Sequence, residues 1–165
     1  MSTLSKELQN AINDQINAEI SSAYLYLAMS ACAQSMGYSG MGKWLRIQWQ
    51  EELSHAMKFL DYVHDRGGSV ALQAVERPPV KFKSPLDIFQ QVLAHEQKVT
   101  GLIDHLCGAA VKEHDYATQY ALQWFINEQV EEEKNAGEIV QQLKMVGESG
   151  PSLIMLDRVL GARGS

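Results

Sequence analysis

Helical periodicity over most of the chain limits its possible folds more than any other feature. Apolar residues recur at alternating steps of three and four, which is the pattern of an amphipathic helix with one buried face. Prolines occur only at positions 78, 79, 85 and 151, so none interrupts the interior of a helix. The sequence therefore predicts an all-α protein. Its four long helices and one short helix are expected at about 5–36, 43–66, 84–113, 115–146 and 152–160.

Local signals at the segment ends support these boundaries. Ser84, which is followed by a proline, is a favoured helix start, because serine caps the first turn and proline fits the first helical position. Asp115 can cap the fourth helix in a similar way. We expect "GYSGMG" (37–42) to end the first helix, and Gly67 and Gly68 to end the second.

The segment between the second and third helices predicts the topology. Residues 69–83, "SVALQAVERPPVKFK", have no helical pattern and can reach at most about 50 Å. The second helix is only about 36 Å long, so the segment can cross its whole length. We therefore expect a four-helix bundle with one long crossover, which makes helices two and three parallel, and a short fifth C-terminal helix. A chain of 165 residues fits a single domain, 1–165.

Composition argues against several classes of protein. A net charge of −6 without a basic run argues against nucleic-acid binding. No run approaches the ~18 apolar residues of a membrane span, and the N-terminal "MSTLSKELQNAINDQ" lacks the apolar core of a signal peptide. Cys32 and Cys107 are far apart in sequence, and we interpret them as reduced, helix-buried thiols of a cytoplasmic protein.

A carboxylate interrupts the apolar stripe of each long helix near its middle. These residues are Glu19, Glu52, Glu96 and Glu132. Any one of them could be a core polar group satisfied by hydrogen bonds, but an unpaired buried carboxylate is strongly unfavourable or becomes protonated. Four carboxylates at one depth would also repel one another, and no Lys or Arg lies on these stripes. Bound metal ions are the best source of the missing positive charge.

Positions along the helices support a common depth for one pair of carboxylates. Glu96 and Glu132 are equally far in sequence from position 114 in the predicted turn, which places both about 27 Å from that turn. The other pair is less even, because Glu19 is much farther from the start of the first predicted loop, at position 37, than Glu52 is from its end, at position 42. We therefore expect this loop to run back along the bundle and level the pair.

His55 adds a nitrogen donor to the predicted site. In Glu52-x-x-His55 the i, i+3 spacing points both side chains to one face of a helix. Oxygen donors with a single imidazole favour iron or manganese over zinc, and the number of ligands fits two metals bridged by carboxylates. The remaining histidines are expected at the surface or its boundary, without a metal: His64, His95, His105 and His114.

At these residues the chain resembles the non-haem bacterial ferritin family. The resemblance covers nearly the whole chain, through the motifs "QINAEISSAYLYLAMS", "QEELSHAMKFLDYVHDRGG", "HEQKVTGLI" and "LQWFINEQVEEEK". It implies a ferritin-like four-helix bundle that self-assembles into a hollow shell of 24 subunits. It also implies a ferroxidase, which oxidises Fe(II) with O2 or peroxide at a di-iron centre within each subunit and stores ferric oxyhydroxide mineral inside the shell.

The resemblance also implies the ligands of the paired irons. Glu19, Glu52 and His55 match the ligands of the first iron. Glu52 matches the bridge to a second iron, which Glu96 and Glu132 also hold.

Further positions match groups around that centre. Gln129 matches a glutamine beside the second iron. Glu51, Glu128 and Glu131, together with Glu132, match an additional third iron site of bacterial members. Gln129-x-x-Glu132 stands where oxygenases of this architecture carry a second Glu-x-x-His, so the second iron is expected to be held more weakly.

Three aromatic and apolar positions complete the comparison. Tyr26 matches a tyrosine that can supply an electron to the centre, and Trp124 matches a nearby aromatic residue. Leu53 stands where the haem-binding bacterioferritins carry a methionine, so the resemblance implies no haem.

Two other functions are compatible with the residues alone. A di-iron peroxide reductase or oxygenase would hold iron stoichiometrically and act on a peroxide or an organic substrate. A helical structural protein would bind no metal and would not oxidise Fe(II). Glu113 and Asp115 either line an entrance channel or lie in a solvated turn, and Glu133 is expected to be a solvated charge.

Overall fold

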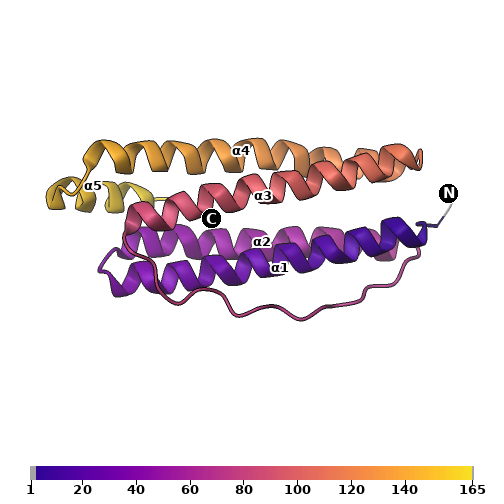
Figure 1. The fold of residues 1–165 in the computed structure, drawn as a ribbon, viewed down its shortest axis with the longest axis horizontal. Coiled ribbons are helices and arrows are strands. Elements are labelled where there is room, and N and C mark those ends of the chain that lie inside the picture. The colour runs from indigo at the N-terminus through magenta and orange to yellow at the C-terminus, as the bar shows by residue number, and fades with distance from the viewer. Residues whose placement is uncertain (1–2, 165) are drawn as a thin grey trace.

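The computed structural model describes residues 3–164 and consists of five helices in that range, without strands. Four of them form an elongated bundle, and the fifth packs across one end of it (Figure 1). The predicted all-α four-helix bundle is therefore confirmed. The helices are α1 (Lys6–Ser35), α2 (Ser39–Asp65), α3 (Pro85–Lys112), α4 (Tyr116–Val146) and α5 (Gly150–Gly161).

The long crossover is also present as predicted. After α2 the chain runs along the outside of the bundle to the opposite end before α3 begins, so α2 and α3 are parallel (Figure 1). Side chains of α1 hold the start of this segment: the Asn13 side chain donates to the Ser69 carbonyl at 3.0 Å and accepts from the Ala71 N–H at 3.0 Å. These bonds satisfy backbone groups that lie outside any helix or sheet.

Three of the helices are capped by the side chain of their own N-cap residue, two of them at predicted residues. Ser84 Oγ accepts a hydrogen bond from the Asp87 N–H at 3.1 Å, and Asp115 Oδ1 accepts one from the Thr118 N–H at 2.9 Å. Ser5 caps α1 in the same way. Each of these bonds satisfies an N–H group that has no partner within its own helix.

The predicted start of α2 at residue 43 was wrong, because the helix begins at Ser39. Gly40 and Gly42, two of the glycines that suggested a loop, are inside the first turn, where Gly40 allows close packing against α5 and Gly42 lies against Gln34 of α1. A Cβ atom at Gly40 would lie 1.8 Å from the Asp157 carbonyl oxygen. The Asp157 carboxylate also caps this helix, accepting from the N–H groups of Gly40 at 3.1 Å and Met41 at 2.8 Å.

The earlier start of α2 explains how the first pair of carboxylates reaches one level. Glu19 is nearly as far in sequence from the end of α1 at Ser35 as Glu52 is from the start of α2 at Ser39. The remaining offset is about one helical turn or less, which corresponds to roughly 5 Å along the axis, and two glutamate side chains can span it. No returning loop is needed, so that expectation was also wrong.

Two apolar clusters fill the bundle on either side of a polar layer. One cluster lies toward α5 and includes Met29, Phe89 and Leu143. The other lies toward the N-terminus of α1 and includes Ile12 and Phe59. The polar layer between them contains these buried residues: Glu19, Gln48, Glu52, His55, Glu96, Gln129 and Glu132.

Other expectations concern the surface and the thiols. Cys32 and Cys107 are free and only half-buried, so they are less enclosed than predicted. His95 is half-buried. As expected, the other histidines outside the polar layer are exposed: His64, His105 and His114. Across residues 3–164, none of the helices combines the length and the apolar character that crossing a membrane requires.

Candidate metal centre

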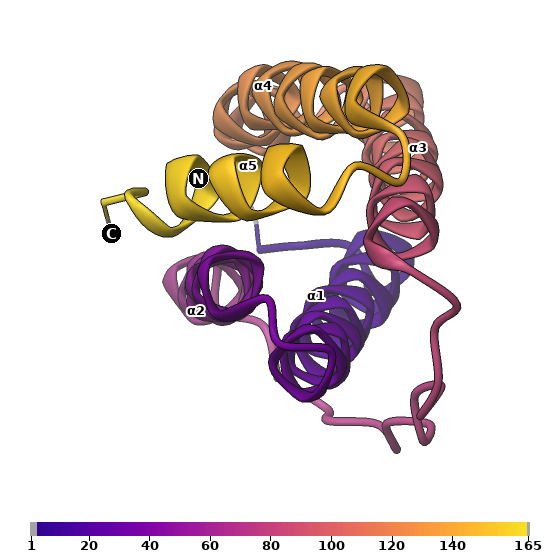
Figure 2. The same cartoon turned by 90° about the vertical axis from the view of Figure 1, so that its left-hand side faces the viewer.

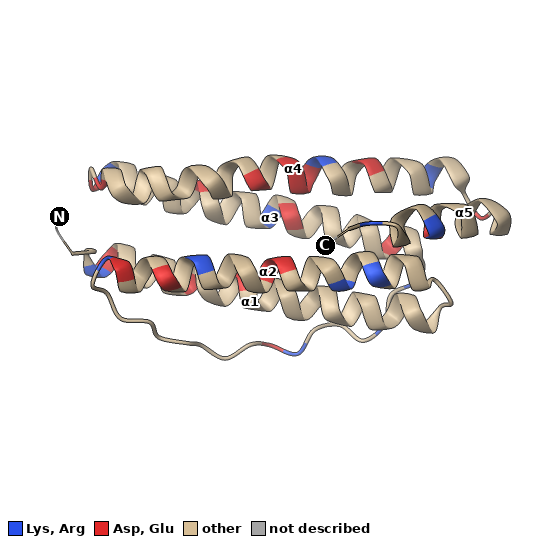
Figure 3. Cartoon of the chain, turned by 180° about the vertical axis from the view of Figure 1, so that it is seen from behind, with Lys and Arg blue, Asp and Glu red and all other residues tan. Residues whose placement is uncertain are grey.

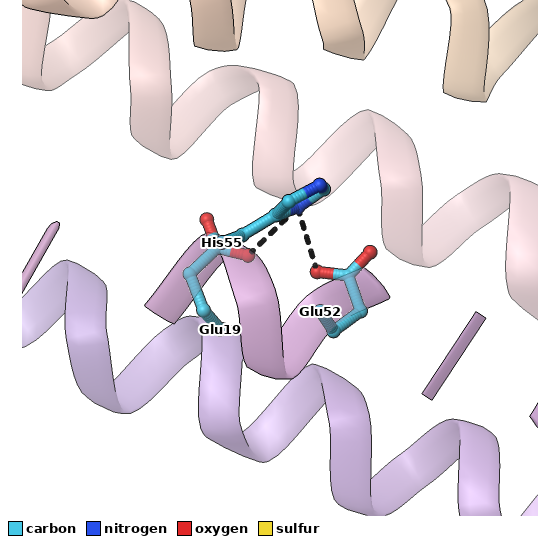
Figure 4. Close-up of side chains that lie close together, drawn as sticks. All are labelled: Glu19, Glu52 and His55. Atoms are coloured by element: carbon cyan, nitrogen blue, oxygen red, sulfur yellow. Dashed lines mark ion pairs between the residues drawn. The ribbon is translucent and has the colours of Figure 1, made fainter. Parts of the chain in front are cut away.

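Three potential metal ligands converge where α1 meets α2. Glu19, Glu52 and His55 each offer a ligand atom within 4.8 Å of the other two. Only 1%, 1% and 4% of these residues is exposed, respectively. Figure 4 shows His55 Nδ1 facing both carboxylates, at 3.5 Å from Glu52 Oε2 and 3.9 Å from Glu19 Oε2. One ion between these atoms would contact two oxygen donors and one nitrogen donor.

The surroundings of Glu19 leave one of its oxygens available. Gln15, one turn earlier on α1, donates to Glu19 Oε1 at 2.9 Å. Glu19 Oε2 is buried and accepts no hydrogen bond from any group of residues 3–164. A buried carboxylate oxygen without a donor is unfavourable in an apolar interior, so this atom fits contact with a cation.

The two carboxylates of α3 and α4 are buried as well, but both have hydrogen-bond donors. Glu96 is 1% exposed and accepts from the Tyr26 hydroxyl and from Gln129 Nε2, the latter at 3.1 Å. Glu132 is 6% exposed and accepts from Gln48 Nε2 at 2.7 Å. All four predicted carboxylates therefore face the same polar layer, although Glu96 and Glu132 are outside the tight group formed by the other two.

Sequence reasoning missed the position of Gln48 between two carboxylates of this layer. Its amide donates to Glu132 Oε2 and also, at 3.3 Å, to Glu52 Oε1. It thereby connects the carboxylates of α2 and α4. The available signal was its place on the apolar stripe of α2, where a buried amide requires polar partners.

Burial and mutual repulsion weaken the acidity of this layer. Burial, and then the charge of Glu52, raises the pKa of Glu19 well above its ordinary value of 4.5. Burial, followed by the charge of Glu96, does the same to the pKa of Glu52. The same two causes raise the pKa of Glu132 to about 8. The layer therefore favours protons or cations over four free negative charges.

The remaining acidic residues of the predicted third site are more open and less gathered. Negative residues lie at the middle of α4 and of α2 (Figure 3). Glu128 is half-buried with Oε1 at 3.9 Å from His55 Nε2, Glu51 is half-buried, and Glu131 is exposed. Among residues 3–164, these three carboxylates do not form a group of ligand atoms as close as that of Glu19, Glu52 and His55.

Comparison with known proteins agrees with this architecture. The model of a ferritin-like domain matches residues 9–146. The chain belongs to the ferritin family. The resemblance to non-haem bacterial ferritins is confirmed, and membership supports iron storage as the function of this ferritin.

Individual relatives match over nearly their whole length. The bacterial non-haem ferritin of Bacteroides fragilis strain 638R is 42% identical over 97% of this chain and 99% of its own. The bacterial non-haem ferritin of Staphylococcus haemolyticus is 38% identical over 97% of this chain and 96% of its own. Among solved structures, the open-pore ferritin of the archaeon Archaeoglobus fulgidus has a TM-score of 0.97 and 49% identity, over 98% of this chain and 100% of that one. These similarities support self-assembly into a multimeric shell.

Two aromatic residues of this ferritin, Tyr26 and Trp124, contact the polar layer. Tyr26 is fully buried on α1, and burial together with the charge of Glu96 raises the pKa of its phenol well above the ordinary value. The Trp124 ring lies edge-on to the ring of His55 at 5.3 Å, and Lys58 Nζ lies 4.1 Å from its centroid. Tyr26 thus touches a carboxylate of the layer, and Trp124 touches its histidine.

Two acidic groups have structural partners that the sequence did not predict. Glu133 is half-buried and accepts from Thr100 Oγ1 at 2.7 Å, so it is less solvated than expected. Asp115 pairs with the Arg66 guanidinium through both oxygens, at 3.0 and 2.9 Å. This ion pair holds the C-terminal end of α2 to the start of α4, while Glu113 is exposed.

Sequence reasoning also missed Arg163. Among the ion pairs of residues 3–164, Arg163 is the one Lys or Arg that pairs with an acidic residue of the predicted sites. Its guanidinium donates to Glu51 Oε2 at 2.8 Å. Arg163 follows α5, and no pattern in the sequence places the end of that helix beside the middle of α2.

Proposed function

We propose that this ferritin oxidises Fe(II) with O2 at a di-iron centre within each subunit and stores the ferric product inside a shell of 24 subunits. The observation that carries the proposal is the buried layer of four carboxylates. Among the ion pairs of residues 3–164, none gives Glu19, Glu52, Glu96 or Glu132 a Lys or Arg partner. The single histidine beside them could offset only one of four charges, so cations from solution are the main means of neutralising them when they are ionised.

Each ligand has a role in this proposal. Glu19 and His55 bind the first Fe(II), and Glu52 bridges it to the second. Glu96 and Glu132 complete the second position. The convergence of the first three ligand atoms within 4.8 Å and the free oxygen of Glu19 support the first position.

The ligand set explains the direction of the reaction. Anionic oxygen donors stabilise a small trivalent cation more than a divalent one, so they favour Fe(III) over Fe(II). Each Fe(II) of the pair gives up one electron, and O2 accepts both electrons and is reduced to peroxide. The peroxide takes up two protons to give hydrogen peroxide, and water hydrolyses the ferric ions to oxyhydroxide with release of protons. Departure of this ferric product frees the site for the next pair.

The second position is built to hold its ion less tightly. Gln129 is a neutral amide where a further charged or imidazole ligand would bind more strongly, and its Nε2 donates to Glu96 Oε2 at 3.1 Å. Tyr26 and Gln48 also donate to Glu96 and Glu132, respectively, so a metal ion at this position competes with these donors for the carboxylate charge. A weakly held product suits a centre that passes ferric ions to a mineral.

Outer groups support later steps of turnover in this proposal. Glu51, Glu128 and Glu131, with Glu132, form a third iron site on the open side of the centre. An ion bound there and the Tyr26 phenol each supply an electron when peroxide is reduced further. The contact of Tyr26 with Glu96 supports its part in this transfer.

The proposal is tested by the mass of the assembled particle before and after addition of Fe(II) in air. Storage predicts an intact shell that gains far more iron than one pair per chain. Loading that stops at one pair per chain would instead favour a di-iron peroxide reductase or oxygenase. Absence of Fe(II) oxidation would favour a structural protein and contradict the proposal.

A further inference from the structure

Arg163 joins three groups beside the proposed iron sites. Its guanidinium donates to Glu51 Oε2 at 2.8 Å, to Gln48 Oε1 at 3.0 Å and to the Trp44 carbonyl at 3.2 Å. The same group stacks over the Trp44 ring, at 4.5 Å from its centroid. Planar stacking combined with several directed hydrogen bonds is a geometry that arginine provides and lysine does not.

The docking of α5 onto α2 brings Arg163 to this position. Figure 2 shows α5 lying between α2 and α4. The Asp157 side chain caps the first turn of α2, and a Cβ atom at Gly161 would lie only 2.8 Å from Gly40 Cα. Two glycines thus allow the backbones to touch, and the residue two positions after Gly161 reaches along α2 toward Glu51.

We propose that Arg163 is a built-in competitor for the third cation, because it occupies the Glu51 carboxylate until a metal ion displaces it. This inference rests on the proposed function, in which Glu51 is a ligand of the third iron. Arginine and metal ion cannot both neutralise the same oxygen at contact distance. The third site therefore fills after the buried centre and only at a higher Fe(II) concentration.

The strength of the contact suits a replaceable partner. The Arg163 and Glu51 side chains are 21% and 34% exposed, respectively, and ion pairs in contact with water are weak. Glu51 also belongs to the same proposed outer cluster as Glu128 and Glu131. Neutralising Glu51 with arginine therefore lowers the attraction of that cluster for a second positive charge.

Gln48 connects this contact to the buried centre. Arg163 binds the amide oxygen of Gln48, which turns the amide nitrogen toward Glu132 and Glu52. When Arg163 leaves, the amide loses the donor that orients it. Arrival of the third ion is thereby communicated to a ligand of the second ion.

The test measures metal binding rather than oxidation. The assembled protein is titrated with Co(II) under anaerobic conditions, following heat and the visible absorption of bound Co(II). In Arg163→Gln, the weak third site is expected to bind Co(II) about tenfold more tightly, because a competing charge-assisted hydrogen bond is lost. The affinity of the first buried position is expected to change by less than about threefold, since its ligands Glu19, Glu52 and His55 do not touch Arg163.

Two further variants control for charge and for folding. Arg158→Gln removes the same charge from an exposed position of α5 that has no ion pair among residues 3–164, and it should leave the third site unchanged. Arg163→Lys keeps the charge but cannot hold Glu51 and Gln48 together, so a smaller gain in affinity is expected. This variant also provides the answer if Arg163→Gln does not assemble.

The outcomes separate the two proposals. If the wild type binds no Co(II) in the buried centre, the proposed function fails. If it binds the buried pair normally and neither Arg163 variant tightens the third site, the competitor role alone is overturned. Equal gains in Arg158→Gln and Arg163→Gln would also overturn it, because a general charge effect would then account for both.

Discussion

The buried layer and the outer acidic cluster of this ferritin are neighbours on the same helices, yet they treat negative charge differently. In the buried layer, Glu19, Glu52, Glu96 and Glu132 have no Lys or Arg ion-pair partner among the described residues. In the outer cluster, Glu51 pairs with Arg163 and Glu131 is exposed to solvent. Burial makes a cation necessary in the first region, whereas water and arginine can replace it in the second.

This difference teaches where metal binding is built into the fold and where it is conditional. The buried ligands are fixed by helix packing and repel one another without an ion. The outer ligands are stable without metal, so their occupancy depends on concentration and on competition. Variants in the two regions should therefore have effects of very different size.

The largest effect is expected from Glu52→Ala. Loss of the bridging carboxylate should slow rapid Fe(II) oxidation by about 100-fold or more, since removal of supporting groups alone costs metal sites roughly 10–100-fold. Stopped-flow absorbance measures the rate, and the mass of the particle checks that the shell still assembles. Asp61→Ala removes an exposed carboxylate from the same helix and should oxidise iron normally. A fast Glu52→Ala variant would contradict the assigned centre.

The next largest effect concerns the pH dependence of the metal-free protein. The folded-state pKa of Glu132, about 8, exceeds its ordinary value of 4.5. Its contribution to stability is therefore fully present below about pH 4.5 and is lost as the pH rises through 8. Relative to wild type, Glu132→Gln should gain at least about 1 kcal/mol of unfolding free energy between pH 5 and 8. Denaturation with a chelator present measures this gain. If unfolding free energy changed with pH in parallel for wild type and Glu132→Gln, the assigned burial effect would be refuted.

A smaller effect is expected from Tyr26→Phe. The variant loses the hydroxyl that donates to Glu96, so we expect the first oxidation step to slow only a few-fold. More peroxide should be released per O2 consumed, because one electron donor is absent. An oxygen electrode with a peroxide assay measures this ratio. Tyr24→Phe, on the same helix but 47% exposed, is the matched control, and an identical ratio in both variants would remove Tyr26 from electron transfer.

The smallest effect on the first step is expected from Glu131→Ala. Because this carboxylate is exposed and outside the tight group of ligands, the initial rate should stay within about twofold of wild type. Later turnover and the ratio of iron to oxygen consumed should change if the third site operates. Glu138→Ala, on the same helix but outside the predicted sites, should change neither quantity. An unaltered ratio in Glu131→Ala would leave the third site without support.

Much of the buried layer could be predicted from sequence because its signals are local. A carboxylate at a stripe position of a helix with about 3.6 residues per turn must face the core. This reasoning identified Glu19, Glu52, Glu96 and Glu132, all of which are buried. The same reasoning did not reveal the partner of Glu133, because the Thr100 hydroxyl that donates to this carboxylate is on another helix.

Contacts between distant parts of the chain explain the remaining differences. The glycines of "SGMG" resemble a loop in sequence, and only the approach of α5 to Gly40 and of Gln34 to Gly42 shows why small residues lie in this helix. Arg163 reaches Glu51 and Gln48 across 112 and 115 positions of sequence, and Asp157 reaches Gly40 across 117. No periodicity links positions so far apart.

The sequence by itself determined the helices, two of their caps, the long crossover and the inward direction of four carboxylates and a histidine, because each depends on residue spacing within one segment. The tertiary structure decided how close the ligands come, which oxygen of Glu19 is left without a donor, and which acidic residue is held by arginine. The physical reason is that hydrogen bonds and ion pairs act over a few ångströms, so they depend on the docking of whole helices.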